Sequence, residues 1–501
     1  MTPSSRAVRT ATVACLLLAW TLLTWRLGER GLWADEHATF EMSRGTLADV
    51  VDKTMADLHP PLYFVVMNGW TGLAGTSDFS LRWPSAAMAL AGVALMPSVA
   101  RRMMGARAAL PATLLLAAAP ALIEFGRMAR YYSLVMTLGL LSTKLLLDSI
   151  EQGGWKRWVA YSASGVAMLY TFYPSGVLLA LQGILALLRR RAASRSWAIA
   201  AACGTIVFAP WFAAVAARQA VGVSGSLGAD FAHSLIGVAL GIGMSVYTFG
   251  VGETLFPWQP EAWVGGALIA LLLRLALRGS QRRGARQAVW IALACIIFMS
   301  LVTTFVSVNT PFINVPVRAL FALPFFLMPI ASGLACLRDP RQRVVLAGVL
   351  LGAWALGEWN YFAGRQFLNP IYLTPAKEAA ALVRQAARED DLVISDIDSV
   401  FDYYFPAGGA MPQHRYTERV DEVASALAAL NPPRVWLVTL GRDRTQRGST
   451  ADVVQGMLLE HYPQREAACL LAIDPTYADI KRALLGRDTY DCRLTVERYE
   501  R

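Results

Sequence analysis

Residues 11–40 read ATVACLLLAWTLLTWRLGERGLWADEHATF. The apolar first half belongs to a run over residues 8–27, the length of about 20 residues that crosses a bilayer. No small-x-small cleavage site follows the run, so we predict an uncleaved membrane span and not a signal peptide. The second half places two adjacent carboxylates, Asp35 and Glu36, beside His37. The stretch predicts a membrane protein with an acidic loop at the edge of its first span.

The composition extends this prediction to the whole chain. The protein has 501 residues, of which 55% are hydrophobic and only 16% are charged, too few charges to cover a soluble domain of this size. Two weaker runs, 61–75 and 233–250, are open to interpretation as helices in the outer interface. The strong apolar runs, which predict about eleven crossings, are 8–27, 83–100, 108–125, 131–148, 156–172, 174–189, 198–217, 263–278, 288–307, 319–337 and 343–360.

The distribution of charge predicts the orientation of the spans. Residues 1–360 carry 29 Lys and Arg against 16 Asp and Glu, whereas residues 361–501 carry 17 against 20. Basic loops face the cytoplasm under the positive-inside rule. This rule places the N-terminus inside and, after an odd number of crossings, residues 28–82 and the tail outside. Because the positive charge belongs to these loops, no nucleic-acid partner is predicted.

The tail has the pattern of a soluble α/β domain. Amphipathic segments such as TPAKEAAALVRQAARE alternate with short apolar ones such as LVIS and RVWLVTL, which predicts a partly parallel sheet with helices. The sequence leaves open whether Cys469 and Cys492 form a disulfide or remain free thiols. We therefore predict a membrane domain over residues 1–360, with 28–82 as a catalytic outer loop, and an extracytoplasmic domain over 361–501.

Charged side chains that suit phosphate chemistry collect on the predicted outer face. A carboxylate can act as general base toward a hydroxyl group, and guanidinium groups can bind phosphate oxygens and stabilise developing charge. Each side chain also has an ordinary explanation, because arginines at span ends reach toward headgroups, loop acids are solvated and tyrosines form aromatic belts. The residues concerned are Asp35, Glu36, Asp57, His59, Arg82, Arg127, Arg130, Tyr131 and Arg318.

The order of these segments resembles that of a known family. WADEHATF is followed by DLHPPLYF, then by DFSLRWPSA and by ARYYSL. This order is similar to that of the protein O-mannosyltransferase-like group of membrane glycosyltransferases (glycosyltransferase family 39 and its bacterial relatives). The resemblance covers roughly residues 1–340, most closely 28–140, and implies a GT-C fold with a polyprenyl-phosphate-sugar donor used outside the cytoplasm.

The resemblance also implies roles for individual residues. Asp35 matches the acid of the first loop that acts as catalytic base, and Glu36 is its neighbour. The family often has a tyrosine after the arginine that Arg318 matches, whereas this chain has Ala319. The residues that the resemblance places at the donor phosphate are His59, Arg82, Arg130 and Arg318, with Asp57, Arg127 and Tyr131 as further candidates.

These observations predict an inverting glycosyltransferase of the bacterial inner membrane. The acceptor is a hydroxyl of a glycolipid, an envelope polysaccharide or a protein. The order of these motifs requires no cofactor. The sequence leaves open whether the enzyme depends on a divalent cation, because Asp35, Glu36 and Asp57 offer oxygen ligands. The alternative is a transporter or flippase for a lipid-linked glycan, although transporters usually carry charges near the bilayer midplane and inverted repeats.

Overall fold

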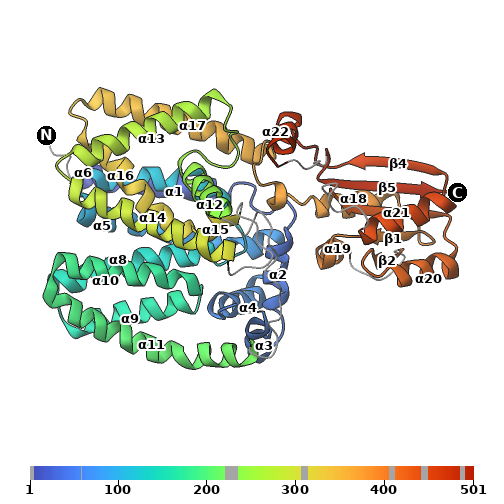
Figure 1. Ribbon diagram of the computed structural model, residues 1–501, viewed down its shortest axis with the longest axis horizontal. Helices are drawn as coiled ribbons and strands as arrows, with labels where there is room; N and C mark the ends of the chain where they lie inside the picture. The colour runs from blue at the N-terminus through green and yellow to red at the C-terminus, as the bar shows by residue number, and fades with distance from the viewer. Residues whose placement is uncertain are drawn as a thin grey trace. The chain divides into compact units, whose positions relative to one another are not determined.

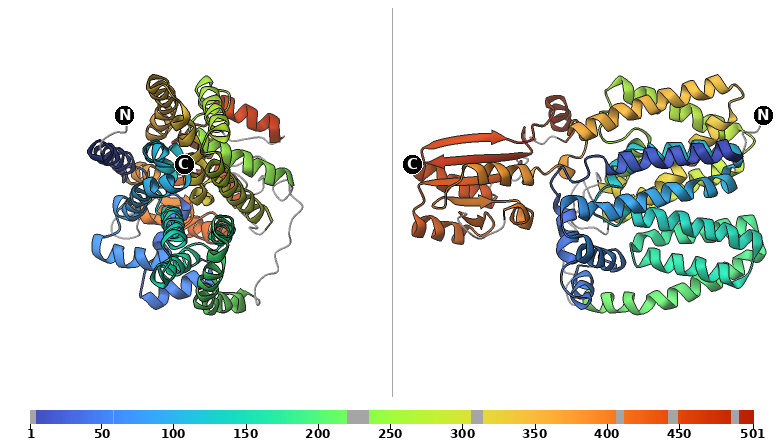
Figure 2. Two further views of the ribbon diagram at one scale, coloured as in Figure 1. Left: turned by 90° about the vertical axis from the view of Figure 1, so that its left-hand side faces the viewer. Right: turned by 180° about the vertical axis from the view of Figure 1, so that it is seen from behind.

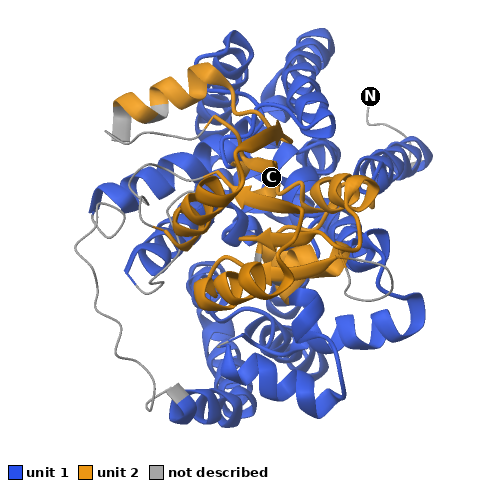
Figure 3. Cartoon of the chain, turned by 90° about the vertical axis from the view of Figure 1, so that its right-hand side faces the viewer, with its two compact units in different colours: residues 1–27, 39–369 blue, residues 28–38, 370–501 orange. Residues whose placement is uncertain are grey.

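The computed structural model describes residues 5–57, 59–219, 235–305, 314–405, 412–441, 449–485 and 491–501. Leu58 of DLHPPLYF, residues 233–234 and residues 306–307 of the predicted segments lie outside these ranges. The chain divides into two compact units (Figure 3). Unit 1 is formed by Met1–Leu27 and Thr39–Asn369, and unit 2 by Gly28–Ala38 and Pro370–Arg501.

Unit 1 is a bundle of helices that lie side by side (Figures 1 and 2). Within the described ranges, every strong apolar run lies mostly in helices, so the predicted helical membrane fold is confirmed. Seven described helices are long and apolar enough to cross a membrane: α1 (Ser5–Thr24), α5 (Asp78–Met104), α8 (Tyr132–Gln152), α11 (Arg191–Gln219), α13 (Pro260–Arg278), α14 (Arg282–Phe305) and α17 (Pro340–Ala363). The shorter ones include α6 (Ala106–Ala117), α9 (Trp155–Leu169), α10 (Gly176–Arg189), α12 (Leu235–Gly250) and α16 (Leu323–Cys336).

The run 108–125, predicted as one span, folds as two helices. Helix α6 is followed by the six-residue helix α7 (Pro120–Phe125), whose first residue is a proline. Proline has no amide hydrogen to continue a preceding helix and is favoured in a first turn, so the chain starts a new helix there. The turn that follows α7 carries Arg127 and Arg130 into α8.

Glycines let the helices of unit 1 approach closely. A Cβ atom on Gly333 of α16 would lie 2.1 Å from the carbonyl oxygen of Leu272 on α13. One on Gly284 of α14 would lie 1.9 Å from the carbonyl oxygen of Met103 on α5. Such separations require a residue without a side chain, as is common where membrane helices cross. The first contact brings α16 against α13, and the second brings α14 against α5, the helix that carries Arg82.

Three short helices lie between α1 and α5 in the chain. They are α2 (Ala34–Met42), α3 (Leu47–Ala56) and α4 (Leu62–Ala74). Thr46 and Asp49 form a capping box that starts α3. Helix α3 packs against α4 and α11, and α4 packs against α5. Helix α4 falls within the weak run 61–75 and has 13 residues, fewer than the about 20 that a span needs.

Unit 2 is built on a five-stranded sheet in the order β2-β1-β3-β5-β4 (Figure 1). The strands are β1 (Leu392–Ser395), β2 (Gln413–Tyr416), β3 (Arg434–Leu440), β4 (Gln464–Cys469) and β5 (Leu494–Glu500). Strands β2, β1 and β3 are parallel, and Ile394 of β1 lies opposite Arg415 and Leu437. Strand β5 is antiparallel to both β3 and β4. The predicted partly parallel sheet is confirmed.

Helices cover both faces of this sheet. They are α18 (Ala376–Ala386) and α19 (Asp398–Tyr404) on one face, and α20 (Val420–Leu430) and α21 (Thr450–His461) on the other, with α22 (Pro475–Leu485) after β4. Val393 packs toward α18 and α19, whereas Leu392 and Ile394 pack toward α20 and α21. Successive strand residues point to opposite faces. Burial on both sides therefore explains why LVIS is apolar at successive positions and does not alternate with polar residues.

The two cysteines of the tail form a disulfide. Cys469 ends β4, Cys492 precedes β5, and their Cα atoms lie 5.8 Å apart. The structure therefore favours the bridge over two free thiols. Their sequence separation is 23, and closing such a loop stabilises a fold by about 3 kcal/mol in the chain-entropy model.

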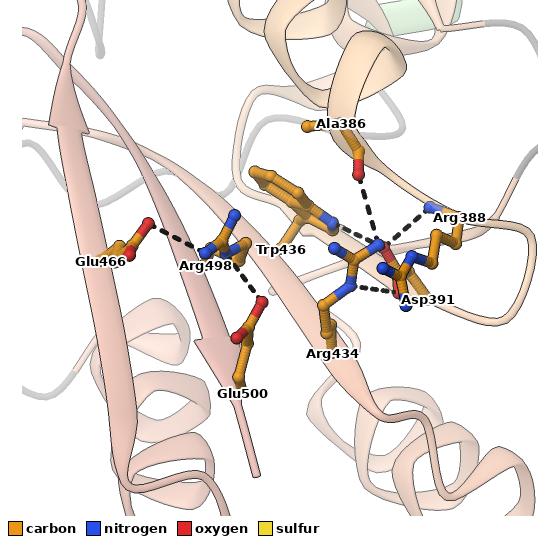
Figure 4. A network of polar contacts seen from close by, with 8 residues as sticks. All are labelled: Ala386, Arg388, Asp391, Arg434, Trp436, Glu466, Arg498 and Glu500. Carbon is orange, nitrogen blue, oxygen red and sulfur yellow. Dashed lines mark hydrogen bonds and ion pairs between the residues drawn. The ribbon is translucent and has the colours of Figure 1, made fainter.

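A buried ion pair fastens the end of α18 to β3 (Figure 4). The side chain of Asp391 is fully buried, and its Oδ2 accepts hydrogen bonds from Nη2 of Arg434 at 2.8 Å and from Nε1 of Trp436 at 2.9 Å. The backbone N–H of Arg388 donates to the same oxygen at 2.9 Å. This carboxylate therefore satisfies donors from the sheet and from the chain that leaves α18.

Asp391→Ala is expected to destabilise unit 2 by about 3–5 kcal/mol, because the Arg434 guanidinium stays buried without its carboxylate. The control is Glu466→Ala, which removes a 3.0 Å pair with Arg498 in the same sheet, where the Glu466 side chain is 75% exposed. Its expected cost is at most about 1 kcal/mol. Hydrogen exchange of β1 and β3 amides in the full-length protein measures both variants. Equal, slight accelerations in the two would contradict the prediction.

Candidate functional site

Arg130 is the centre of a polar cluster in unit 1. It lies in the turn between α7 and α8 and is buried. Its Nη1 donates to Oγ1 of Thr39 at 3.2 Å, and its Nη2 lies 3.4 Å from Nε2 of His59. Its guanidinium carbon lies 5.1 Å from the centre of the Tyr131 ring, a cation–π contact. Three predicted donor-site residues, Arg130, His59 and Tyr131, are therefore neighbours.

Buried hydrogen bonds from neighbouring helices position the Arg130 turn. Ser85 of α5 donates to the carbonyl oxygen of Arg130 at 3.0 Å, and the hydroxyl of Tyr63 on α4 lies 2.8 Å from the Ser85 oxygen. Ser133 of α8 donates to the carbonyl oxygen of Gly126 at 3.0 Å. Buried polar groups that satisfy one another hold a single arrangement. Helices α4, α5 and α8 thus fix the backbone that carries the guanidinium.

His59 links Arg130 to Asp57. Its Nδ1 lies 2.8 Å from the carbonyl oxygen of Asp57 and 3.0 Å from the Asp57 carboxylate. Both oxygens are acceptors, so the network is satisfied when Nδ1 carries the proton and Nε2 accepts from Arg130. The rings of Phe64 and Tyr131 lie beside the imidazole, with centroids 5.7 and 6.2 Å away. Asp57 therefore orients His59 from the rim of the cluster.

Arg82 and Arg127 bind backbone carbonyl groups just beyond the end of α1. Nη1 of Arg82 donates to the carbonyl oxygen of Leu27 at 3.1 Å, and Nη2 of Arg127 donates to that of Trp25. Arg127 also lies over the ring of Phe362 on α17, 4.9 Å from its centroid. Cations are favourable beside the last carbonyls of a helix. Both arginines therefore stabilise the backbone where the first loop begins. Their role at the donor phosphate stays a prediction.

Arg318 is the last residue of the short helix α15 (Val315–Arg318) and is half-buried. Helix α15 packs against α12 and α14. The role of Arg318 at the donor phosphate also stays a prediction.

The acid pair lies in the first turn of α2, in unit 2. Glu36 is 1% exposed, and its Oε2 accepts the backbone N–H of Trp33 at 3.3 Å. Trp33 directly precedes α2 and Glu36 is its third residue, so this bond is one half of a capping box. Asp35 is partly exposed. Because the Glu36 carboxylate already caps the helix, Asp35 is the better candidate for the carboxylate that accepts a proton from a substrate hydroxyl.

One turn of α2 separates Asp35 from Thr39, the residue that accepts the Arg130 hydrogen bond. Side chains four residues apart project from the same side of a helix, with Cβ atoms about 5–6 Å apart. Thr39 is not among the site residues predicted from the sequence. Its four-residue spacing from Asp35 is the signal that identifies it once a helix is assumed there.

A second buried acid, also missed, lies in the loop between α12 and α13. Glu253 is fully buried, and the hydroxyl of Thr248 donates to its Oε1 at 3.4 Å. Burial and the carboxylate of Glu124 raise the pKa of Glu253 well above its ordinary value, which favours the protonated form. The sequence shows one acid in GVGETLFP and gives no sign that the acid is buried.

A cavity of about 850 Å³ lies between α9 and α11, where Trp158 and Ile199 line it, and none of the predicted site residues faces it. Within the described ranges, no group of three or more His, Cys, Asp or Glu side chains is placed to hold a metal ion.

Comparison with known families matches one segment in the first half of the chain. Residues 58–213 match the dolichyl-phosphate-mannose-protein mannosyltransferase family. The matched segment contains His59, Arg82 and Arg130 and begins after the acid pair. No curated protein matches the chain. The match agrees with the resemblance found in the sequence and carries it over residues 58–213.

Solved structures of similar fold cover nearly the whole chain. The crystal structure of ArnT from Cupriavidus metallidurans in the apo state is 14% identical with a TM-score of 0.58, over 98% of both chains. The structure of the same protein bound to undecaprenyl phosphate is 16% identical with a TM-score of 0.55, over 99% of this chain and 98% of that one. The apo oligosaccharyltransferase of Archaeoglobus fulgidus is 10% identical with a TM-score of 0.51, over 99% and 89%. The predicted GT-C fold is confirmed.

Proposed function

We propose that the protein transfers a sugar from a polyprenyl-phosphate-sugar donor to a hydroxyl acceptor of the cell envelope, with inversion at the anomeric carbon. The observation that carries the proposal is the Arg130 cluster. His59 and Thr39 lie within 3.4 Å of the Arg130 guanidinium, and Asp35 lies one helical turn before Thr39. The name of the matched family includes a lipid-phosphate sugar, and ArnT was crystallised with undecaprenyl phosphate; both support this class of donor.

In the proposed reaction, the Asp35 carboxylate accepts the proton of the acceptor hydroxyl while the hydroxyl oxygen attacks C1 of the sugar. The new bond to C1 forms as the bond from C1 to the phosphate oxygen breaks. The electron pair of that bond leaves with the polyprenyl phosphate. Attack from the face opposite the leaving group inverts C1, as in inverting glycoside chemistry.

Arg130 is the proposed main contact of the leaving phosphate. Its planar guanidinium can bind two phosphate oxygens at once, and its buried position strengthens the interaction with the charge that develops there. The Tyr131 ring and the Thr39 hydroxyl hold the guanidinium plane before the donor arrives. Arg82 and Arg318 are proposed to add positive charge.

The direct test uses purified full-length protein with a polyprenyl-phosphate sugar labelled in the sugar, together with an envelope extract as acceptor. The expected result is equal release of polyprenyl phosphate and transfer of label to the acceptor. Movement of intact donor across a proteoliposome membrane, with no release of polyprenyl phosphate, would instead support the transporter alternative.

We also propose that the protein lies in a bacterial inner membrane, with a cytoplasmic N-terminus and an extracytoplasmic tail. The disulfide between Cys469 and Cys492 supports this orientation, because disulfides persist in oxidising compartments. Fusions of a reporter that is active only in the cytoplasm are expected to be active at residue 192 and silent at residue 365, since the basic loop 189–195 stays inside. The same activity at both positions would contradict the orientation.

A further inference from the structure

The segment that leads into α2 is hydrogen-bonded to side chains of the tail, within unit 2. The backbone N–H of Leu32 donates to the hydroxyl of Tyr404 at 2.6 Å. Nζ of Lys377 donates to the carbonyl oxygens of Gly28 at 3.1 Å and of Glu29 at 3.4 Å. Each bond removes conformations that a free loop would sample. Together they restrict the chain just before the acid pair.

The two segments also pack tightly at Gly31. A Cβ atom there would lie 3.0 Å from Cβ of Lys377 and 3.6 Å from the Tyr404 ring. A side chain at Gly31 would therefore push Lys377 and the segment apart. Glycine at this position allows the Leu32 amide to reach the tyrosine hydroxyl.

Aromatic contacts hold the chain on both sides of the acid pair. The ring of Trp33 packs edge-on against Tyr372, with centroids 5.0 Å apart, and that of His37 packs against Tyr403 at 5.9 Å. Edge-to-face pairs of this kind prefer a defined geometry and stabilise a contact beyond simple burial. Trp33 precedes and His37 follows the two acids, so the first turn of α2 is fixed at both ends.

Helix α19, which carries Tyr403 and Tyr404, is itself fastened to the sheet. Oδ1 of Asp402 lies 2.7 Å from Nδ1 of His414, whose Nε2 lies 2.8 Å from Oγ of Ser395. The order of residue types is that of a serine hydrolase triad, but Ser395 is fully buried and the Asp402 side chain is 47% exposed. A nucleophile has to be reached by its substrate, so this chain of bonds joins α19 to β1 and β2 instead.

We infer that the tail positions the catalytic acid, with Tyr404 as the main positioning residue. The inference rests on the proposed function, because it assigns the base role to Asp35. Tyr404 does not touch the reacting atoms in this scheme; it holds the Leu32 amide, and thereby the start of the helix that presents Asp35. A general base has to stay within hydrogen-bond reach of the proton that it accepts, and small displacements of such a group lower the rate strongly.

The first test measures the segment itself and needs no activity. Tyr404→Phe in the full-length protein keeps the ring and removes the hydroxyl that accepts the Leu32 N–H. Hydrogen exchange of residues 28–38 is expected to accelerate about fivefold or more, the effect of losing one hydrogen bond. The control is Tyr462→Phe, which removes a hydroxyl that donates to the carbonyl oxygen of Pro432 at 3.0 Å in the same unit. Wild-type exchange in Tyr404→Phe, or equal acceleration in both variants, would overturn the inference.

The second test separates positioning from general loss of structure. In Tyr404→Phe we expect kcat to fall about tenfold or more with KM for the donor within about twofold, since the interaction lost acts on the acid and not on the phosphate. Tyr462→Phe is expected to keep both constants. If Tyr404→Phe keeps the wild-type kcat while Asp35→Asn is inactive, the positioning role of Tyr404 is refuted and the base role of Asp35 stands. Wild-type turnover in Asp35→Asn would refute the proposed base and leave the exchange result as a test of the contact.

Discussion

Asp35→Asn is expected to lower kcat by about 10²-fold or more, because the amide cannot accept the proton of the acceptor hydroxyl. The side chains have nearly the same size, and Asp35 is only partly buried in the first turn of α2, so the fold should be retained. The measurement is the initial rate of polyprenyl phosphate release by the purified variant, with donor binding measured separately. Binding should change little, since the proposed phosphate contacts are on Arg130 and its neighbours.

Glu36→Gln is the matched control for Asp35→Asn. It also replaces a carboxylate by an amide of equal length, one residue along the same helix. Glutamine can keep the bond to the Trp33 N–H, as it does in other capping boxes. We therefore expect a clearly milder loss of turnover than in Asp35→Asn. Slight and equal effects in both variants would show that neither carboxylate takes part in catalysis.

Hydropathy was sufficient to predict the long apolar helices of unit 1, because a bilayer requires long apolar segments whatever their partners are. It could not predict the break before Pro120 within the run 108–125, since both sides of the break are apolar. In unit 2, LVIS and RVWLVTL were recognisable as strands because most of their residues are apolar. The edge strand β2, which reads QHRY and is partly exposed, carries no such signal.

The candidate site was predictable only in part, for a different physical reason. Arg130 and Tyr131 are adjacent in the chain, whereas His59 lies 71 residues before Arg130, so their contact is long-range and was expected only because the family resemblance assigns all three residues to the donor site. The bond between Leu32 and Tyr404 joins residues 372 positions apart. Neither hydropathy nor the spacing of charges indicates such a pair, because many tyrosines in the chain offer the same hydroxyl. The use of Glu36 as a helix cap likewise depends on where α2 begins.

Arg130→Ala is expected to weaken binding of polyprenyl phosphate by about 10- to 10²-fold, the effect of losing charge-assisted hydrogen bonds of roughly 1.5–3 kcal/mol. Arg130→Lys should recover only part of this affinity, because an ammonium group lacks the planar fork that binds two oxygens. The fork has a defined orientation in the free protein, where Thr39 lies 3.2 Å from Nη1 and His59 lies 3.4 Å from Nη2. A lysine at this position could not keep both contacts with one nitrogen in the same geometry.

The affinity of the purified protein for polyprenyl phosphate, measured without sugar or acceptor, tests Arg130 independently of the chemistry at Asp35. The control is Arg44→Ala, which removes an arginine of unit 1 that is 59% exposed in its side chain and paired with Glu41 at 3.1 Å. An exposed pair of this kind contributes at most about 1 kcal/mol, so Arg44→Ala should bind as the wild type does. If Arg130→Ala also binds normally, the Arg130 cluster is a structural network of the helix ends and the donor phosphate has to be held elsewhere. If Arg130→Ala loses affinity and Asp35→Asn keeps it, binding and proton transfer belong to separate groups, as the proposed mechanism requires.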